Sequence, residues 1–200
     1  MGDGLVFYVP STAKHREAEI MKDCGTILSE REMSRTLERL AVEIYERRGD
    51  DASLAILGIQ RRGADLAERL KKLLDARLGR KVPLGKLDIN LYRDDWTTNL
   101  ELAPTINCSE IGFDVEGKSI VLVDDVLYSG RTIRAALEAI LDYGRPRRVE
   151  LLVLVDRGHR ELPIQADYVG KKLDTLGNEH VNVLVVERDG EDRVCLVRGE

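Results

Sequence analysis

The spacing of apolar residues alternates along this chain between helical and extended periods, and the alternation predicts an α/β fold. After Ser29, apolar residues recur at helical spacing as far as Gly49. The start S-E-R-E, with a glutamate three residues after the serine, is typical of a capping box. Residues 54–59 form a compact apolar run, as a buried strand does, and residues 64–78 return to helical spacing. A strand joined to a helix by a sharp turn at residues 60–63 is therefore predicted.

The same patterns recur in the second half of the chain. The further predicted strands are residues 87–92, 119–123, 149–155, 181–186 and 194–197, and the further predicted helix is residues 132–143. Strands separated by helices imply a mainly parallel sheet flanked by helices, because parallel strands need crossover connections. The last two strands are predicted to be edge strands or a hairpin.

Two stretches lack any regular period. Residues 1–28 are predicted to be an N-terminal extension, partly disordered, ahead of a single domain at residues 29–200. Residues 93–113 follow a predicted strand without any period of their own. An irregular stretch of this length inside a compact domain is usually functional or disordered. We therefore expect a flexible lid loop there.

Composition places the chain among globular proteins. Of its 200 residues, 43% are hydrophobic and 34% are charged. The apolar runs fall far short of the ~18 residues of a membrane span, and the start lacks the charged and apolar regions of a signal peptide, so we expect a cytoplasmic protein without a membrane partner. The net charge of −5 excludes a globally basic nucleic-acid binder but allows a local basic face. Cys24, Cys108 and Cys195 are far apart and predict reduced thiols without a zinc site.

The candidate chemistry concentrates in residues 120–132, which read IVLVDDVLYSGRT. An apolar strand runs into two adjacent acids, Asp124 and Asp125. Neighbouring side chains of a strand point to opposite faces, so the two acids cannot grip one metal ion in the usual way. At the end of the strand both can accept hydrogen bonds from neighbouring hydroxyls. The vicinal hydroxyls of a ribose meet that requirement.

A polar loop follows the acids and leads into the predicted helix. Consecutive backbone N–H groups at a helix N-terminus favour anions, and a glycine allows a close approach or a positive φ. A sugar phosphate is therefore the predicted ligand. The predicted binding segment consists of Asp124, Asp125, Val126, Leu127, Tyr128, Ser129, Gly130, Arg131 and Thr132. An ordinary turn followed by a helix capped by Thr132 is the alternative interpretation.

Four segments of the chain resemble one family. They are LDINLYRDD at residues 87–95, VDDVLYSGRT at 123–132, LVDRGHRELP at 154–163 and ADYVGK at 166–171. The second resembles the phosphoribosyl-pyrophosphate signature of type I phosphoribosyltransferases. All four in this order resemble the PyrR family of pyrimidine operon attenuators and uracil phosphoribosyltransferases. The resemblance implies a type I phosphoribosyltransferase fold, conversion of uracil and phosphoribosyl pyrophosphate to UMP and pyrophosphate, and assembly as a homodimer or a larger homo-oligomer.

The resemblance also implies which residues bind pyrophosphate and which take part in catalysis. The residues implied at pyrophosphate are Gln60, Arg61, Arg62, Gly63 and Arg93. In the family this loop often contains a cis peptide bond that does not involve proline. Arg61 is one catalytic candidate, and Asp125, which would stabilise positive charge developing on the sugar, is the other. Two solvated arginines in a turn are the alternative for Arg61 and Arg62.

The base and the metal ion complete the implied site. Base binding is implied for Asp156, Arg157 and Val181. Mg²⁺ is the expected cofactor, held through substrate oxygens and water and not by protein side chains alone. His159 and Arg160 are weaker candidates for contact with the substrate. Trp96, in the expected lid, receives no role.

The family's other activity, UMP-dependent binding of leader RNA, is less well supported by the sequence. Arg35 and Arg39 on the first helix are the candidate RNA contacts; the other arginines that could extend the patch are Arg47, Arg48, Arg145, Arg147 and Arg148. Glu38 and Val42, however, stand where RNA-binding members tend to carry a hydroxyl and a histidine. A solvated helix with ion pairs between residues four apart is the alternative.

Several other functions conflict with the sequence or rank behind this one. The chain has no G-x-G-x-x-G, and its G-x-x-x-x-G at residues 58–63 continues with Ala-Asp instead of Lys-Ser or Lys-Thr. Dinucleotide and nucleoside-triphosphate sites are therefore not expected. Purine salvage remains an alternative because it shares the acidic loop, and so does an RNA-binding regulator with vestigial catalysis.

Overall fold

A computed structural model of the chain describes residues 5–7, 20–94 and 109–198. These residues fall into two compact units, a core unit of residues 35–173 and a terminal unit of residues up to 34 and from 174 onward. Helix α1, Glu30–Arg48, begins in the terminal unit and continues into the core unit. Most of the lid loop predicted at residues 93–113, with Trp96, lies outside the described residues.

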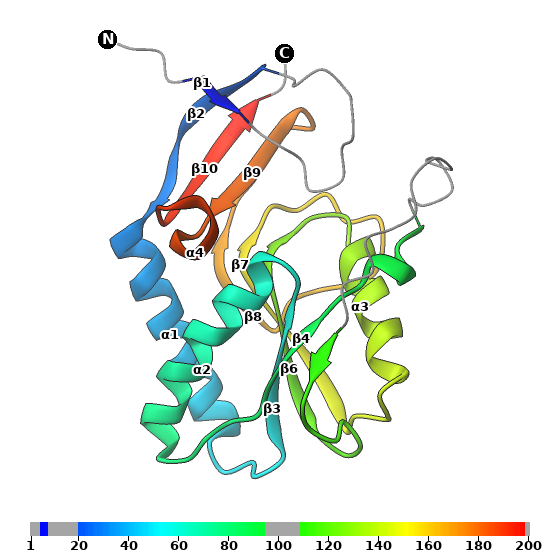
Figure 1. Cartoon of the computed structure of the whole chain (residues 1–200). Coiled ribbons are helices and arrows are strands. Elements are labelled where there is room, and N and C mark those ends of the chain that lie inside the picture. The colour runs from blue at the N-terminus through cyan, green and yellow to red at the C-terminus, as the bar shows by residue number, and fades with distance from the viewer. Residues whose placement is uncertain (1–4, 8–19, 95–108, 199–200) are drawn as a thin grey trace. The chain divides into compact units, whose positions relative to one another are not determined.

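The core unit is built on a six-stranded sheet in the order β5-β4-β3-β6-β7-β8 (Figure 1). The strands are β3 Leu54–Ile59, β4 Leu84–Leu87, β5 Glu110–Ile111, β6 Ser119–Leu127, β7 Arg148–Asp156 and β8 Tyr168–Lys172. All neighbouring pairs are parallel except β4 with β5. The predicted fold class, α/β with a mainly parallel sheet, is confirmed.

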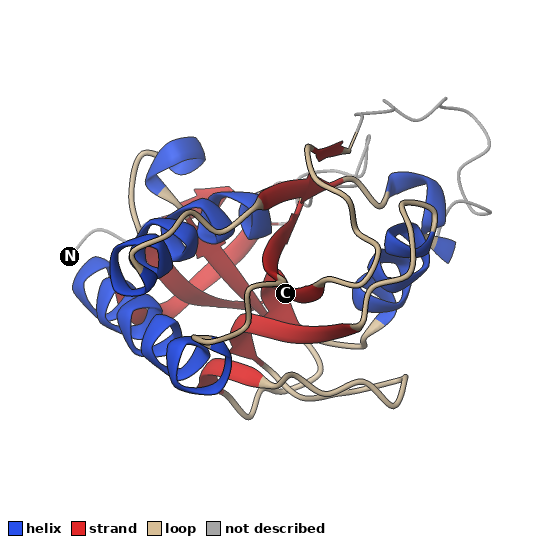
Figure 2. Ribbon diagram, turned by 90° about the horizontal axis from the view of Figure 1, so that it is seen from below, coloured by secondary structure: helices blue, strands red, loops and turns tan. Residues whose placement is uncertain are grey.

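Helices cover both faces of this sheet, as Figure 2 shows. Helix α2, Arg62–Leu78, lies beside α1 on one face, and α3, Arg131–Leu141, packs on the other. Every residue of β3 is buried, as expected for a central parallel strand shielded on both sides. The apolar side chains of α3 pack with those of β3, β6 and β7 in one core cluster. The β3-α2 and β6-α3-β7 units predicted from the sequence are thus confirmed.

The strand predicted at residues 87–92 is wrong. Strand β4 ends at Leu87, and Asn90–Tyr92 form the 3-10 turn η1. The carboxylate of Asp88 accepts a hydrogen bond from the backbone N–H of Asn90 at 2.9 Å, which curls the chain into a turn. The apolar side chains of residues 87–92 alternate with polar ones, which predicts a half-buried strand with Leu91 on the buried face, but Leu91 is 61% exposed.

The terminal unit contains an antiparallel sheet in the order β1-β2-β10-β9. Its elements are β1 Leu5–Phe7, β2 Ile20–Ser29, β9 Glu179–Leu184, the short helix α4 Val186–Asp189 and β10 Arg193–Arg198. The two strands predicted near the C-terminus therefore pair with each other, in a second sheet. Residues 20–28 of the predicted extension belong to β2, and the division into an extension and one domain stays a prediction. None of the described helices is long and apolar enough to cross a membrane.

Candidate active site

The two adjacent acids lie at the carboxyl end of β6. The strand runs on to Leu127, beyond its predicted end, so both acids belong to it. Asp124 is buried, and Asp125 is partly exposed. The backbone N–H of Asp125 donates to Asp124 Oδ1 at 3.0 Å, and that of Val126 donates to Asp125 Oδ1 at 2.8 Å. Backbone donors thus fix both carboxylates beside the start of the phosphate loop, Tyr128–Thr132.

Burial raises the pKa of both carboxyls. For Asp124, whose pKa is well above its ordinary value, the neighbouring charge of Asp125 adds to the effect, and the guanidinium of Arg93 opposes it. For Asp125 the charge of Arg62 opposes the effect of burial. The structure therefore brings Arg62 and Arg93, both predicted to bind pyrophosphate, into the electrostatic neighbourhood of the acids.

The pyrophosphate loop, Gln60–Gly63, connects β3 to α2 against the end of β6. Its Gln60–Arg61 peptide bond is cis. A Cβ added to Gly63 would lie 2.6 Å from the carbonyl oxygen of Val123 and 3.3 Å from Asp124 Oδ1. Only glycine leaves room for this approach. The absence of a side chain at position 63 is what lets the pyrophosphate loop and the acids share one edge of the sheet.

The phosphate loop has the geometry of an anion site at a helix N-terminus. Gly130 has φ +93° and is the N-cap of α3, a conformation that favours glycine. The first N–H groups of a helix have no partner within the helix, and the N-cap Gly130 has no side chain to cap them; the N–H of Arg131 makes a long hydrogen bond of 3.4 Å to Ser129 Oγ. The side chain of Arg131 turns to protein acids instead, with Nε 2.6 Å from Glu161 and Nη1 2.6 Å from Asp94. In this structure Arg131 contributes its backbone to the phosphate loop, while its guanidinium is paired with acids outside the loop.

The residues predicted to bind the base divide between the two units. Asp156 ends β7, and the buried guanidinium of Arg157 lies 4.1 Å from the ring centroid of Tyr128. Both residues therefore belong to the same edge of the core sheet as the phosphate loop. Val181 lies in β9 of the terminal unit, where it pairs with Leu196 of β10.

Comparison with known proteins identifies the family. Residues 23–188 match the family described as phosphoribosyl transferase domain. The chain is 53% identical over 176 residues to the bifunctional protein PyrR of Pelotomaculum thermopropionicum, covering 88% of this chain and 97% of that one. It is 54% identical to the bifunctional protein PyrR of Thermus aquaticus, with the same coverage. The chain belongs to the PyrR family.

Solved structures of lower identity agree with the fold of this PyrR-family chain. A hypoxanthine phosphoribosyltransferase of Trypanosoma cruzi has a TM-score of 0.68 at 14% identity, covering 88% of this chain and 92% of that one. One from Staphylococcus aureus has a TM-score of 0.64 at 20% identity, covering 86% and 92%. These likenesses confirm the predicted type I phosphoribosyltransferase fold, and the family predicted from the four segments is confirmed by the PyrR relatives.

The basic face of α1, which we define as Arg35, Arg39, Arg47 and Arg48, is largely engaged within this PyrR-family chain. Arg39 donates to the carbonyl oxygens of Val169 and Gly170, at 3.2 and 2.6 Å. Arg47 Nη2 lies 2.7 Å from the carboxylate of Glu43, and Arg48 pairs with Glu150. Arg35 is exposed. Three of the four arginines of this face are therefore tied to protein acceptors, and of the two predicted RNA contacts Arg39 is engaged and Arg35 is exposed.

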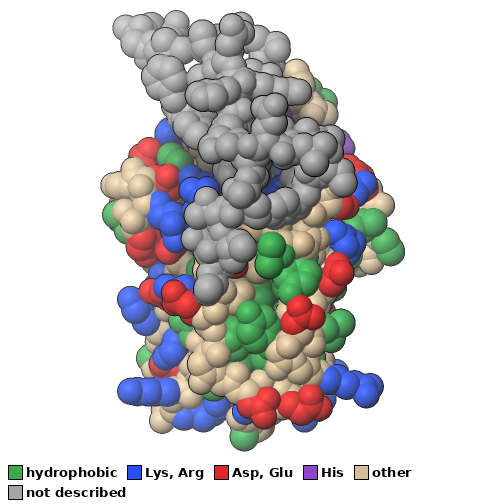
Figure 3. Space-filling view, turned by 45° about the vertical axis from the view of Figure 1, so that its right-hand side comes forward, with side chains coloured by type: hydrophobic (Ala, Val, Ile, Leu, Met, Phe, Trp, Pro, Cys, Tyr) green, Lys and Arg blue, Asp and Glu red, His purple; other side chains and the backbone are tan. Residues whose placement is uncertain are grey.

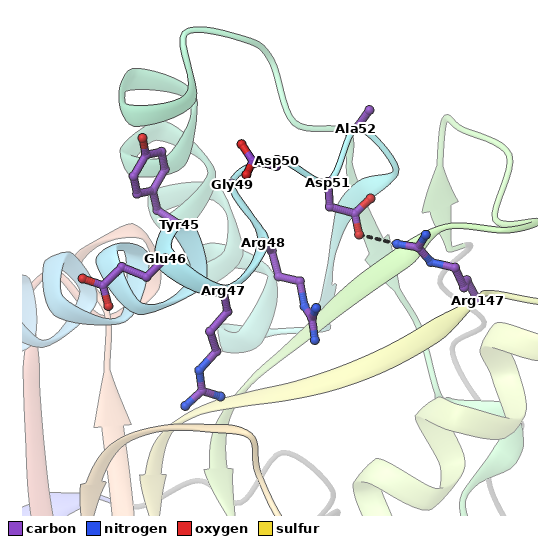
Figure 4. A pocket seen from close by; sticks show the side chains of 9 residues that line it. All are labelled: Tyr45, Glu46, Arg47, Arg48, Gly49, Asp50, Asp51, Ala52 and Arg147. Atoms are coloured by element: carbon purple, nitrogen blue, oxygen red, sulfur yellow. Dashed lines mark hydrogen bonds and ion pairs between the residues drawn. The ribbon is translucent and has the colours of Figure 1, made fainter.

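The last turn of α1 also borders an open groove of about 550 Å³, shown in Figure 4. Arg47, Arg48 and Arg147 line it together with Asp50 and Asp51. Arg147 Nη2 also donates to Ser119 Oγ at 2.7 Å and pairs with Asp51. On the face seen in Figure 3 basic and acidic side chains likewise lie interspersed. Neither view presents an unbroken basic surface.

One contributor to the site was assigned no structural role from the sequence. Arg160 Nη1 donates to the carbonyl oxygen of Tyr128 at 2.8 Å, and its Nη2 pairs with Asp156 at 2.6 Å. The sequence named Arg160 only as a weak candidate for contact with substrate. A side chain that binds backbone carbonyls leaves no pattern of residue types, because every residue supplies a carbonyl.

Proposed function

We propose that this chain is a uracil phosphoribosyltransferase, which converts uracil and phosphoribosyl pyrophosphate to UMP and pyrophosphate. The observation that carries the proposal is the meeting of three parts at one sheet edge: the acids of β6, the phosphate loop and the pyrophosphate loop. Ligands of α/β proteins bind at the carboxyl ends of parallel strands. Membership of the PyrR family and the phosphoribosyl transferase domain support this activity.

Each part has a task that follows from its chemistry. The backbone N–H groups of residues 128–132 bind the 5-phosphate, and Asp124 and Asp125 accept hydrogen bonds from the ribose hydroxyls. Arg62 and Arg93, whose charges act on the acids, neutralise pyrophosphate as it leaves, with Arg61 and the backbone of the pyrophosphate loop. Asp125 also stabilises positive charge that develops on the sugar.

The donor set fits a magnesium ion that arrives with the substrate. Among the described residues no group of three or more His, Cys, Asp or Glu side chains could hold a metal ion, whereas Mg²⁺ commonly binds through one or two carboxylates, water and substrate phosphates. Bound in this way, Mg²⁺ would neutralise negative charge on pyrophosphate. Asp124 and Asp125 remain available to the ribose hydroxyls.

Asp156 and Arg157 are proposed to read the uracil, and the assignment of Val181, in the terminal unit, stays a prediction. Asp156 ends β7, the strand next to β6, and Arg157 follows it. Asp156 is linked to the phosphate loop through Arg160, and Arg157 through Tyr128. Purine salvage is the competing activity. Incubating the protein and phosphoribosyl pyrophosphate with uracil, hypoxanthine or guanine separates the two, since the proposal requires UMP and is refuted if only IMP or GMP forms.

The second proposed activity is binding of pyrimidine-operon leader RNA in response to UMP, by a homodimer or larger assembly. The curated relatives are named bifunctional, which supports it. Arg35 and Arg39 are the proposed contacts. A gel shift with the leader RNA at two salt concentrations tests this activity, because contacts with phosphates weaken steeply as salt rises. A complex that UMP does not strengthen would contradict it.

A further inference from the structure

Three consecutive carbonyl groups, at the end of β6 and the start of the phosphate loop, are bound by the segment that follows β7. The carbonyl of Leu127 accepts from the N–H of Arg157 at 3.1 Å. The carbonyl of Ser129 accepts from the N–H groups of Glu161 and Leu162, at 3.0 and 3.1 Å. Between them, the carbonyl of Tyr128 accepts from a side chain, that of Arg160. The side chain thus fills a gap between two backbone contacts.

Every arm of the Arg160 guanidinium has an acceptor. Nη1 donates to the carbonyls of Tyr128 and Gly158, at 2.8 and 3.0 Å, and Nε donates to that of Ile164 at 3.0 Å. Nη2 lies 2.6 Å from Asp156 Oδ1. The side chain is only 21% exposed. The planar guanidinium carries five N–H donors and can bind all four acceptors at once, whereas the compact ammonium group of a lysine cannot reach all of them.

The direction of these carbonyls matters for a phosphate site. A peptide group that points its N–H toward an anion points its C=O away, because in a trans peptide the two bonds lie in one plane and point in opposite directions. A carbonyl turned toward the phosphate would repel it. Binding the carbonyls of residues 127–129 from behind therefore holds the loop in the orientation in which its amides face the ligand, before any ligand is present.

We propose that Arg160 is a positioning residue that sets the phosphate loop from the base-binding end of β7, and so couples the two halves of the substrate site. This inference rests on the proposed function for its ligands. Arg160 acts through the carbonyl of Tyr128 and the carboxylate of Asp156, and does not contact the phosphate. Losing it should weaken phosphate binding more than it weakens the fold.

The test is binding of ribose 5-phosphate, which engages the phosphate loop without pyrophosphate or base. Calorimetry on the full chain compares the wild type with Arg160→Gln and Arg160→Lys. We expect Kd to rise about tenfold or more in both variants, since a charge-assisted hydrogen bond to the loop is lost. Arg77→Gln is the matched control, because Arg77 is an exposed arginine that also donates to a backbone carbonyl, that of Leu73, within α2. It should leave Kd unchanged.

Amide hydrogen exchange without ligand supplies a second readout. Residues 128–132 should exchange faster in the Arg160→Lys variant, and β3 should exchange at the wild-type rate. Full recovery of affinity by lysine would show that positive charge alone matters and would overturn the positioning role. Equal affinity in all proteins, or faster exchange throughout the chain, would overturn it as well. Absence of UMP formation by the wild type refutes the proposed function separately, since neither readout depends on turnover.

Discussion

The phosphate site and the basic face of α1 differ in how their charges are satisfied within the protein. At the end of β6, two carboxylates are held by backbone N–H groups and have raised pKa values, because burial disfavours their charge more than nearby arginines favour it. On α1, Arg39, Arg47 and Arg48 already have acceptors in the same chain. Nearby arginines compensate the buried acids of β6 only in part, so a ligand could supply the rest. The arginines of α1 are already largely compensated by groups of the same chain.

The difference teaches how to separate the two proposed activities. Ligand hydroxyls and a bound cation would relieve the buried acids, so the apo protein is prepared for its substrate. RNA would have to compete with Glu43, Glu150 and the carbonyls of β8 for the same guanidinium groups. Exposed ion pairs are worth little individually, so this competition weakens RNA binding without forbidding it. We expect the enzyme activity to be the more robust of the two.

Replacing both acids, Asp124→Asn with Asp125→Asn, should have the largest effect of all, a loss of UMP formation at the phosphate site. Hydrogen bonds to a charged acceptor contribute about 1.5–3 kcal/mol each, so kcat/KM for UMP formation should fall at least about 100-fold. Steady-state kinetics with varied phosphoribosyl pyrophosphate measures the loss. Circular dichroism should show an unchanged fold, and wild-type turnover in the double variant would contradict the assigned role.

Gly63→Ala tests whether the pyrophosphate loop and the acids need their close approach. The new Cβ would lie 2.6 Å from the carbonyl oxygen of Val123, so the loop or β6 must move, at a cost of about 1–3 kcal/mol. We expect a lower midpoint of thermal unfolding and roughly tenfold weaker binding of pyrophosphate. Gly177→Ala is the control, because nothing lies within 4 Å of its added Cβ. If both variants behave alike, the packing argument fails.

The double substitution Glu38→Thr with Val42→His should strengthen RNA binding by the basic face of α1. Both positions are exposed on α1, and removing an acid beside Arg35 and Arg39 removes repulsion toward phosphates. We expect affinity for leader RNA to rise about tenfold at low salt, as measured by gel shift, with UMP formation unchanged. The same double change made with Arg39→Ala should gain less. An affinity equal to that of the wild type would show that these two positions do not limit RNA binding.

For Asp124→Asn alone we expect a smaller effect, which is a change in thermal stability. Because the pKa of Asp124 is raised in the folded state, its ionisation destabilises the fold progressively as the pH rises above the ordinary value of about 4. Asparagine removes this term, so the unfolding midpoint at pH 8 should rise by about 2–4 °C per kcal/mol relieved. The gain should vanish near pH 4, where the unfolded carboxyl also becomes protonated. Melting curves at both pH values check this, and a gain that does not depend on pH would refute the cause.

The sequence predicted those parts of the fold whose structure depends on local patterns. The strand at residues 54–59 has the predicted bounds. The first helix begins after Ser29, whose N–H and hydroxyl both donate to Glu32, at 2.9 and 2.7 Å. Strand β2 was not predicted, because its sequence IMKDCGTILS has no clean alternation and its pairing with β10 joins residues far apart in the chain. At residues 87–92, one side-chain turn at Asp88 overrode an apparently extended pattern.

The candidate site was predictable where residue types carry the chemistry. The acids, Gly130 and the arginines of the pyrophosphate loop all appear in the sequence as unusual choices for their places. The structure adds what depends on backbone geometry. It shows that Arg131 pairs with Asp94 and Glu161, and that Arg160 holds the carbonyl of Tyr128. Residue spacing encodes neither contact, because one partner is a carbonyl and the other two are surface acids on separate segments.

The three bound carbonyls of residues 127–129 also have a consequence for kinetics. Because the backbone amides of the phosphate loop are already oriented, the loop needs little further ordering when a sugar phosphate binds. Stopped-flow mixing with ribose 5-phosphate should therefore give a single phase whose rate rises in proportion to concentration and does not level off. A plateau would instead mark a rate-limiting isomerisation of the protein before or after the encounter.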